Sequence, residues 1–238
     1  MFAEDEAALL LGSGRTGAAL EALVLRRLAG EPLETILGWV AFGGRRLTVR
    51  PGVFVPRRRT ELLARTAAEH CGARSVLLEL CCGVGPVAAT VTAGEIHLSD
   101  LDPYALECAR INVPHGRVHL GDLYADLPDH LRGRIDVVAA NAPYVPTDRI
   151  ALMPPEARDH ELPIALDGGA DGADLHRRIA AGAPEWLAAG GVLMIETSPS
   201  QAPLTERAMH DAGLTTEVLT DDELDGCVVV GVRPGERA

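Results

Sequence analysis

The sequence contains no lysine, few aromatic residues and no long apolar run. Its 22 basic residues are all arginine and face 34 acidic residues, so the net charge is −12 and stable nucleic-acid binding is disfavoured. No stretch approaches the roughly 20 apolar residues that span a bilayer. The opening MFAEDEAALLL is acidic where a secretory signal would be basic. We therefore expect a cytoplasmic protein without membrane contact.

The sequence also lacks any C-x-x-C pair, although it has five cysteines. An odd number does not complete a disulfide framework, and the spacings differ from those of zinc sites. We predict that neither of the neighbouring Cys81 and Cys82 forms a disulfide, and that the chain binds no metal. The other cysteines are Cys71, Cys108 and Cys227.

Apolar periodicity predicts a doubly wound α/β sheet behind a short N-terminal segment. Residues 3–11 and 16–29 have helical spacing, and WVAFGGRRLTV has the signal of a β-hairpin. From about residue 60, apolar strands alternate with helical patterns, which is typical of a mostly parallel sheet. The predicted strands are 75–80, 95–100, 117–120, 135–141 and 191–197, followed by an antiparallel pair at 215–220 and 227–232. We divide the chain into a helical segment and hairpin (1–59) and an α/β domain (60–238).

A glycine turn follows the first of these strands, in LLELCCGVGPVAATV. Gly83 and Gly85 allow positive φ angles and let a ligand approach the backbone closely. The pattern is not G-x-G-x-x-G, because Val87 and Ala88 stand where a third glycine would be. A dinucleotide with its pyrophosphate is therefore disfavoured.

Acidic residues end the next two strands. Asp100 lies where open α/β sheets bind ligands and is predicted to accept the hydroxyls of a ribose. Asp102, just before a proline, is the better candidate for a helix N-cap, which leaves Asp100 for the ligand. Asp122 is predicted to accept the amino group of an adenine, with Leu123 against the ring. A glycine turn, a ribose acid and an adenine acid together indicate S-adenosylmethionine.

The fourth strand ends in NAPYVP, and there the sequence resembles the protein-(glutamine-N5) methyltransferases, which methylate a glutamine of peptide release factors. The resemblance runs over nearly the whole chain. It implies a class I S-adenosylmethionine-dependent methyltransferase fold, with a mostly parallel seven-stranded sheet and a C-terminal antiparallel pair. The segments that carry it are PLETILGWVAFGGRRLTVRPGVFVPRRRTELL, LELCCGVG, DLDPYALECARIN, NAPYVP, HELPIALDGGADG and IETSPSQ.

The resemblance also implies the site residues and the partner. Asn141 and the backbone carbonyl of Ala142 would each accept one N–H of the target amide, and Tyr144 would pack against it, with Pro143 completing the box. Positioning and charge arrangement suffice for transfer from an activated methyl, so we nominate no general base. The implied substrate is a protein, either a peptide release factor or another glutamine-bearing protein. The implied cofactor contacts are Glu79, Cys81, Cys82, Gly83, Val84, Gly85, Asp100, Leu101, Asp122, Leu123 and Asn141.

Several departures from the family's pattern leave the methyl acceptor open. About thirty residues precede the hairpin, fewer than the family's N-terminal helical domain needs. We interpret the chain as a diverged paralogue. The alternatives are an N-methyltransferase that acts on a small molecule or on an adenine of nucleic acid, and a non-catalytic protein that binds S-adenosylmethionine. The departures are Cys81, Cys82 and Val84 for Gly, Thr and Ser or Thr, Ala142 for the first proline of the box, and Arg58 and Arg59 for the Pro-Glu of RPETE.

Arginines are concentrated between the hairpin and the first strand of the sheet. Within 21 residues the only acid is Glu61. A solvated face is the favoured interpretation of this charge pattern, and a docking patch for an acidic partner or RNA is the alternative. The seven residues are Arg45, Arg46, Arg50, Arg57, Arg58, Arg59 and Arg65.

Overall fold

The computed structural model describes residues 3–235, with the backbone alone for Ala157. The first two residues of the predicted N-terminal segment and the last three of the α/β domain, 236–238, lie outside the described residues. Within the described part, no helix is long and apolar enough to cross a membrane. The division of the chain after residue 59 stays a prediction.

A seven-stranded sheet forms the centre of the protein, in the order β5-β4-β3-β6-β7-β9-β8. The first five strands in this order are parallel, and β9 runs antiparallel to both β7 and β8. This confirms the predicted class I fold. The chain moves outward from β3 to β5 and then returns to the other side of β3, which places a ligand-binding switch point at the carboxyl end of β3. The strands are β3 (Val76–Leu80), β4 (Glu95–Asp100), β5 (Arg117–Leu120), β6 (Ile135–Ala140), β7 (Leu187–Glu196), β8 (Thr215–Asp221) and β9 (Gly226–Val232).

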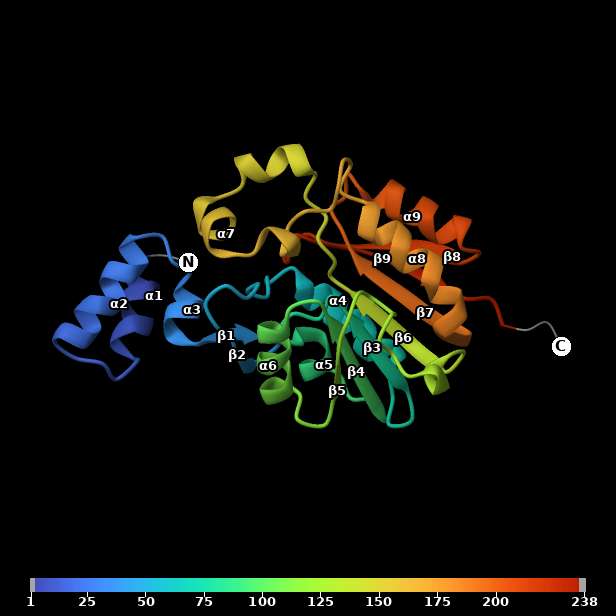
Figure 1. Ribbon diagram of the computed structural model, residues 1–238, viewed down its shortest axis with the longest axis horizontal. Helices are drawn as coiled ribbons and strands as arrows, with labels where there is room; N and C mark the ends of the chain where they lie inside the picture. The colour runs from blue at the N-terminus through green and yellow to red at the C-terminus, as the bar shows by residue number, and fades with distance from the viewer. Residues whose placement is uncertain (1–2, 236–238) are drawn as a thin grey trace.

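Helices cover both faces of the sheet (Figure 1). Successive strand residues point to opposite faces, so the fully buried neighbours Leu77 and Leu78 belong to two separate core clusters. One cluster packs under α4, α5 and α6, and the other packs under α8 and α9. The near-continuous apolar strands of the sequence follow from this double coverage. The helices are α4 (Thr60–His70), α5 (Pro86–Thr90), α6 (Pro103–Asn112), α8 (Asp174–Trp186) and α9 (Ala202–Asp211).

The N-terminal part has a small core of its own, formed by Leu10, Leu33 and Ile36. Its two predicted helices and its hairpin are confirmed, whereas α3 was not predicted. The hairpin is tied to α6, because Asn112 accepts the N–H of Thr48 at 2.7 Å and donates to its carbonyl at 3.0 Å. The elements are α1 (Ala3–Leu11), α2 (Ala18–Leu28), α3 (Leu33–Leu37), β1 (Trp39–Phe42) and β2 (Arg45–Thr48).

A long connection between β6 and α8 arches over the end of the sheet where β6 finishes (Figure 1). Its short helices were not predicted, since pieces of three to six residues show no clear period. Glu161 anchors the arch. It is 5% exposed, and both of its carboxylate oxygens accept a hydrogen bond from Nη2 of Arg57, each at 2.7 Å. The pieces are η2 (Thr147–Leu152), α7 (Pro155–His160) and η3 (Pro163–Ala165).

Four of the seven clustered arginines form ion pairs with acids from distant parts of the chain. The interpretation as one solvated face is therefore incomplete, because Arg57 and Arg59 are half-buried and reach inward. Acids from other parts of the chain therefore neutralise much of the positive charge of this arginine-rich segment. The pairs are Arg50–Glu107, Arg57–Glu161, Arg59–Glu196 and Arg65–Asp221.

Candidate active site

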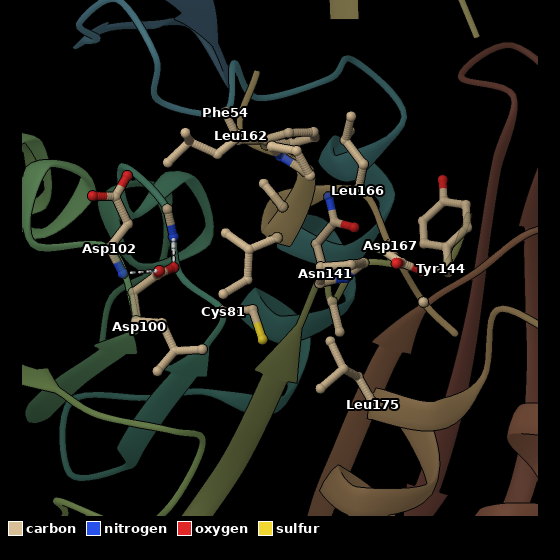
Figure 2. Close-up of a pocket in the computed structure, with 18 of the residues that line it drawn as sticks. Phe54, Cys81, Asp100, Asp102, Asn141, Tyr144, Leu162, Leu166, Asp167 and Leu175 are labelled. Atoms are coloured by element: carbon tan, nitrogen blue, oxygen red, sulfur yellow. Dashed lines mark hydrogen bonds between the residues drawn. The ribbon is translucent and has the colours of Figure 1, made fainter. Parts of the chain in front are cut away.

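A cavity of about 570 Å³ opens where β3, β4, β5 and β6 end. The ends of these four strands all contribute to its wall, so predicted residues from Cys81 to Tyr144 face one space. Figure 2 shows Asp100 on one side, Asn141 on the other and Cys81 between them. The predicted residues in the wall are Cys81, Gly83, Asp100, Leu101, Asp122, Leu123 and Asn141 to Tyr144. Four others, Glu79, Cys82, Val84 and Gly85, are not part of it.

The two glycines after β3 do different things, although both have the positive φ that the turn pattern predicts. A Cβ on Gly83 would meet nothing within 4 Å, so this backbone faces the open cavity. A Cβ on Gly85 would lie 2.8 Å from the Leu98 side chain and 3.2 Å from that of Val113. Gly83 therefore offers close approach to a ligand, while Gly85 allows the loop to pack on the core.

Cys81 adopts a left-handed conformation, with φ of 48°, at a position where the family's pattern has glycine. A side chain in this region is strained. Burial raises the pKa of the Cys81 thiol, and the nearby Asp100 carboxylate adds to the effect.

All five cysteines are free thiols. In the part of the chain that the structure describes, no group of His, Cys, Asp and Glu could hold a metal ion.

Glu79 points to α5 and not to the cavity. Its carboxylate accepts the backbone N–H groups of Val87 at 3.2 Å and Ala88 at 2.7 Å, in the first turn of that helix. Burial raises the pKa of Glu79 to about 8, although the two N–H donors oppose this shift. The carboxylate thus holds the helix in place behind the glycine loop, and its predicted contact with the cofactor stays a prediction.

Asp100 is already part of a hydrogen-bond network within the chain. One carboxylate oxygen accepts the N–H of Gly83 at 2.7 Å, and the other accepts the N–H of Asp102 at 2.9 Å (Figure 2). Burial raises the pKa of Asp100, and these N–H donors lower it in turn. Each oxygen can accept a second hydrogen bond. The pair of remaining acceptor sites suits the two hydroxyls of a ribose.

Asp102 caps α6, as predicted, because its side chain accepts the N–H of Tyr104 at 2.8 Å.

Asp122, at the third strand tip, pairs with Arg178 of α8 at 2.7 Å. Arg178 also lines the cavity, and nothing near it in the sequence indicated this. Beside it, Leu123 is 7% exposed and offers an apolar surface. The predicted adenine contacts remain compatible with this wall, with Arg178 as an additional neighbour.

The acceptor box follows β6 directly. The side-chain Nδ2 of Asn141 donates to the hydroxyl of Thr60 at 3.1 Å. Among the described residues, nothing donates to Asn141 Oδ1 or to the Ala142 carbonyl. Two hydrogen-bond acceptors therefore stand on consecutive residues at the cavity wall, where the sequence predicted them.

Tyr144 closes the box on the side away from Asp100 (Figure 2). Its ring lies 6.4 Å from that of His176, and the guanidinium of Arg59 lies 5.6 Å from its centroid. Its carbonyl accepts a hydrogen bond from Gln201 at 2.8 Å. Burial raises the pKa of Tyr144 to about 12, so the phenol stays neutral near pH 7 and is not a base. Sequence reasoning did not assign Thr60, His176 or Gln201 to the site, because their contacts with the box arise only on folding.

Comparisons with known proteins identify the type of domain and the fold. The family model for "Methyltransferase small domain" matches residues 45–153. A solved Mtq2–Trm112 complex of E. cuniculi, described as responsible for methylation of the eRF1 translation termination factor, matches with a TM-score of 0.56 at 19% identity, over 77% of this chain and 99% of that one. This likeness concerns the fold alone.

Relatives in sequence define the family more closely. A release factor glutamine methyltransferase of Mycolicibacterium smegmatis is 37% identical over 218 residues, which are 88% of this chain and 76% of that protein. A 4-amino-L-phenylalanine/4-methylamino-L-phenylalanine methyltransferase of Streptomyces pristinaespiralis is 35% identical over 73% of this chain and 63% of that protein. The resemblance found in the motifs is confirmed. The chain belongs to the release factor glutamine methyltransferase family and is an S-adenosylmethionine-dependent methyltransferase.

Proposed function

We propose that this protein transfers the methyl group of S-adenosylmethionine to the side-chain amide nitrogen of a protein glutamine. One observation carries the proposal. Asn141 Oδ1 and the Ala142 carbonyl are two acceptors that no described residue uses, at the wall of the cavity that Gly83 and Asp100 also line. A primary amide is a group with two N–H donors on one nitrogen, so it matches this pair.

The chain's work is to orient a weak nucleophile. An amide nitrogen reacts poorly because its lone pair is delocalised into the carbonyl. When bound, S-adenosylmethionine supplies a methyl group that its sulfonium already activates. Asn141 and Ala142 each accept one N–H of the substrate amide. This fixes the plane of the NH₂ group, so that the nitrogen lone pair is directed out of that plane toward the methyl carbon. The same acceptors stabilise the positive charge that develops on nitrogen during transfer, and the extra proton leaves to water afterwards.

The surroundings of the box favour this alignment. Tyr144 presents a neutral, half-buried ring on which the flat amide group can pack. Pro143 follows Ala142 and biases it toward an extended backbone, which keeps the carbonyl in position. Leu166 and Leu175 add apolar wall (Figure 2). Exclusion of water by such a wall strengthens the hydrogen bonds to the acceptor amide.

A peptide release factor is the first protein to test as substrate, and another glutamine-bearing protein is the alternative. The support is that a relative named release factor glutamine methyltransferase is 37% identical over 88% of this chain. The experiment incubates the purified chain with methyl-labelled S-adenosylmethionine and a bacterial release factor, then digests the product for mass spectrometry. We expect label on one glutamine as N5-methylglutamine, and little label with Asn141→Ala. Label on a nucleobase, or none on any protein, would contradict the proposal.

One observation favours a second candidate, an aromatic amine that carries a carboxylate. Arg59 lies at the acceptor end of the cavity, where the family's motif has an acid, and places a positive charge beside Tyr144. One relative is named for methylation of 4-amino-L-phenylalanine. Such a substrate also presents an NH₂ on an sp² carbon. The same assay with this amino acid separates the two, since only one acceptor should be methylated at low enzyme concentration.

A further inference from the structure

Arg178 of α8 and Asp122, which follows β5, form an ion pair at the wall of the cavity. Arg178 Nη2 donates to Asp122 Oδ2 at 2.7 Å, across 56 positions of the chain. Both residues line the cavity, and their side chains are 52% and 45% exposed, respectively. A pair this exposed contributes little to stability, because water solvates both charges and screens their attraction. What the pair does fix is the orientation of the Asp122 carboxylate.

Tyr124 holds the two partners' backbones together. It lies in the same loop as Asp122, and its hydroxyl donates to the carbonyl of Ile179, the residue after Arg178, at 3.0 Å. Its ring stacks on that of Trp186, with 5.9 Å between the centroids. A Cβ on Gly182 would lie 2.7 Å from the Tyr124 ring, so helix and loop are in close contact. The ion pair therefore joins two segments that are already fixed relative to each other.

The pair leaves one oxygen of Asp122 available to a ligand. Arg178 engages Oδ2, and among the described residues nothing donates to Oδ1. An unpaired carboxylate can turn about its last side-chain bond, because that torsion is only weakly restricted. The hydrogen bond from Arg178 removes this freedom. One acceptor of known direction thus remains at the cavity wall.

Such an acceptor can distinguish two kinds of purine. Adenine has an amino group at position 6, which donates hydrogen bonds, whereas a 6-oxo purine has a carbonyl oxygen there, which only accepts. A carboxylate oxygen also only accepts. It forms a hydrogen bond with the first group and repels the second. The distinction depends on an oxygen that stays directed at position 6.

We propose that Arg178 is a positioning residue for the cofactor: it holds the Asp122 carboxylate so that Oδ1 accepts the 6-amino group of adenine, and it thereby makes the site selective for a 6-amino purine. The inference goes beyond the proposed function, because it concerns S-adenosylmethionine and holds for any methyl acceptor. Arg178 acts through Asp122, so replacement of either residue should change the same property of the site.

The test compares two ligands that differ only at position 6 of the base. S-adenosylhomocysteine has the amino group, and S-inosylhomocysteine has the oxo group. We expect calorimetry to show that the parent binds the first about 10- to 100-fold more tightly, as for one hydrogen bond to a charged group. Arg178→Met removes the ion pair and keeps a long side chain. It should lower this preference by about three- to tenfold, because the Asp122 side chain must then be ordered on binding.

Three further variants separate positioning from a general structural effect. Arg177→Met is the matched control, because Arg177 precedes Arg178 on α8 and forms exposed ion pairs with Asp171 and Asp174 but does not line the cavity. It should keep the parental preference. Arg178→Lys keeps a cationic donor and should restore part of the preference. Asp122→Ala should abolish it, and addition of Arg178→Met to Asp122→Ala should change nothing further, since coupled residues are not additive.

Several outcomes would overturn the proposal. They are equal Kd values of the parent for the two ligands, an unchanged preference in Arg178→Met, an equal loss in Arg177→Met, and a further loss in the double variant. Tighter binding of S-adenosylhomocysteine by Arg178→Met would show that the arginine blocks Asp122. Neither ligand carries a transferable methyl group, so these measurements need no acceptor. A chain that methylates no glutamine would refute the proposed function and leave the Kd comparison as it is.

Discussion

The carboxylate of Asp100 accepts the backbone N–H of Gly83 at 2.7 Å and so ties the glycine loop after β3 to the end of β4. The same side chain holds the N–H of Asp102, where α6 begins. Asp100 therefore shapes the cavity before any ligand arrives. Asp100 thus holds the loop in shape and is also predicted to contact the cofactor. Its replacement should therefore weaken cofactor binding even in a protein that still folds.

Asp100→Ala should weaken the binding of S-adenosylmethionine by roughly 1–3 kcal/mol, about 5- to 150-fold in Kd. The reason is that two backbone N–H groups lose their acceptor, together with the ribose hydroxyls that Asp100 is predicted to bind. Isothermal calorimetry measures this directly. Asp129→Ala, at an exposed acid on η1, serves as control and should bind like the parent. Equal Kd values for parent and Asp100→Ala would remove Asp100 from the cofactor site.

Asn141→Ala should lower the methyl-transfer rate by on the order of a hundredfold, because it removes an acceptor used in the transition state. Ala142→Pro keeps the backbone carbonyl and restores the ring found in the family's box. It should change the rate by less than about tenfold, or roughly 1.4 kcal/mol. Single-turnover assays on the identified acceptor compare the two. An Asn141→Ala variant as fast as the parent would mean that the box is only a turn.

Cys81→Gly should unfold at higher urea concentration than Cys81→Ala. The left-handed φ of 48° at this position costs a residue with a Cβ roughly 1 kcal/mol, which glycine avoids. Cys82 provides the matched control, because it is not among the residues with positive φ. There the order should reverse, with alanine more stable than glycine by about 0.5–1 kcal/mol. The same order at both positions would show that the strain at Cys81 is negligible.

Stability should depend on His176 below neutral pH. Burial lowers its pKa from 6.5 to about 4, so the folded state holds the imidazole neutral while the unfolded state takes up a proton. Its contribution is therefore complete above pH 6.5 and is lost as the pH falls toward 4. Between pH 7 and 4.5 the loss should amount to roughly 2–3 kcal/mol.

The test measures urea unfolding of the parent and of His176→Phe at both pH values. The variant is expected to be less stable at pH 7, because Thr205 loses its hydrogen bond to the imidazole, but to show a smaller loss on acidification. His97 and His119, whose pKa values burial also lowers, are present in both proteins and cancel. If His176→Phe lost as much stability on acidification as the parent, His176 would not be a buried neutral group.

Much of the fold could be predicted because its signals are local. The predicted strand at 95–100 coincides with β4, since a short run of residues between Gly94 and Pro103 was enough to define it. The predicted strand at 191–197 corresponds to β7, which begins earlier, at Leu187. The arch over the cavity escaped prediction because its short helices have no period. Nothing in the sequence around Glu161, which anchors the arch, predicts its ion pair with Arg57, because the two residues are brought together only by folding.

The sequence by itself determined which side chains stand at the ends of the parallel strands, and therefore that Asp100, Asp122 and Asn141 meet at one edge. That conclusion needs only the order of strands and turns. Tertiary structure decided what each of these groups is bonded to. Asn141 donates to the hydroxyl of Thr60, 81 residues earlier in the chain, and Arg59 pairs with Glu196 across 137 residues. Composition shows that a buried charge or amide needs a partner, but only packing brings one particular partner within hydrogen-bonding distance.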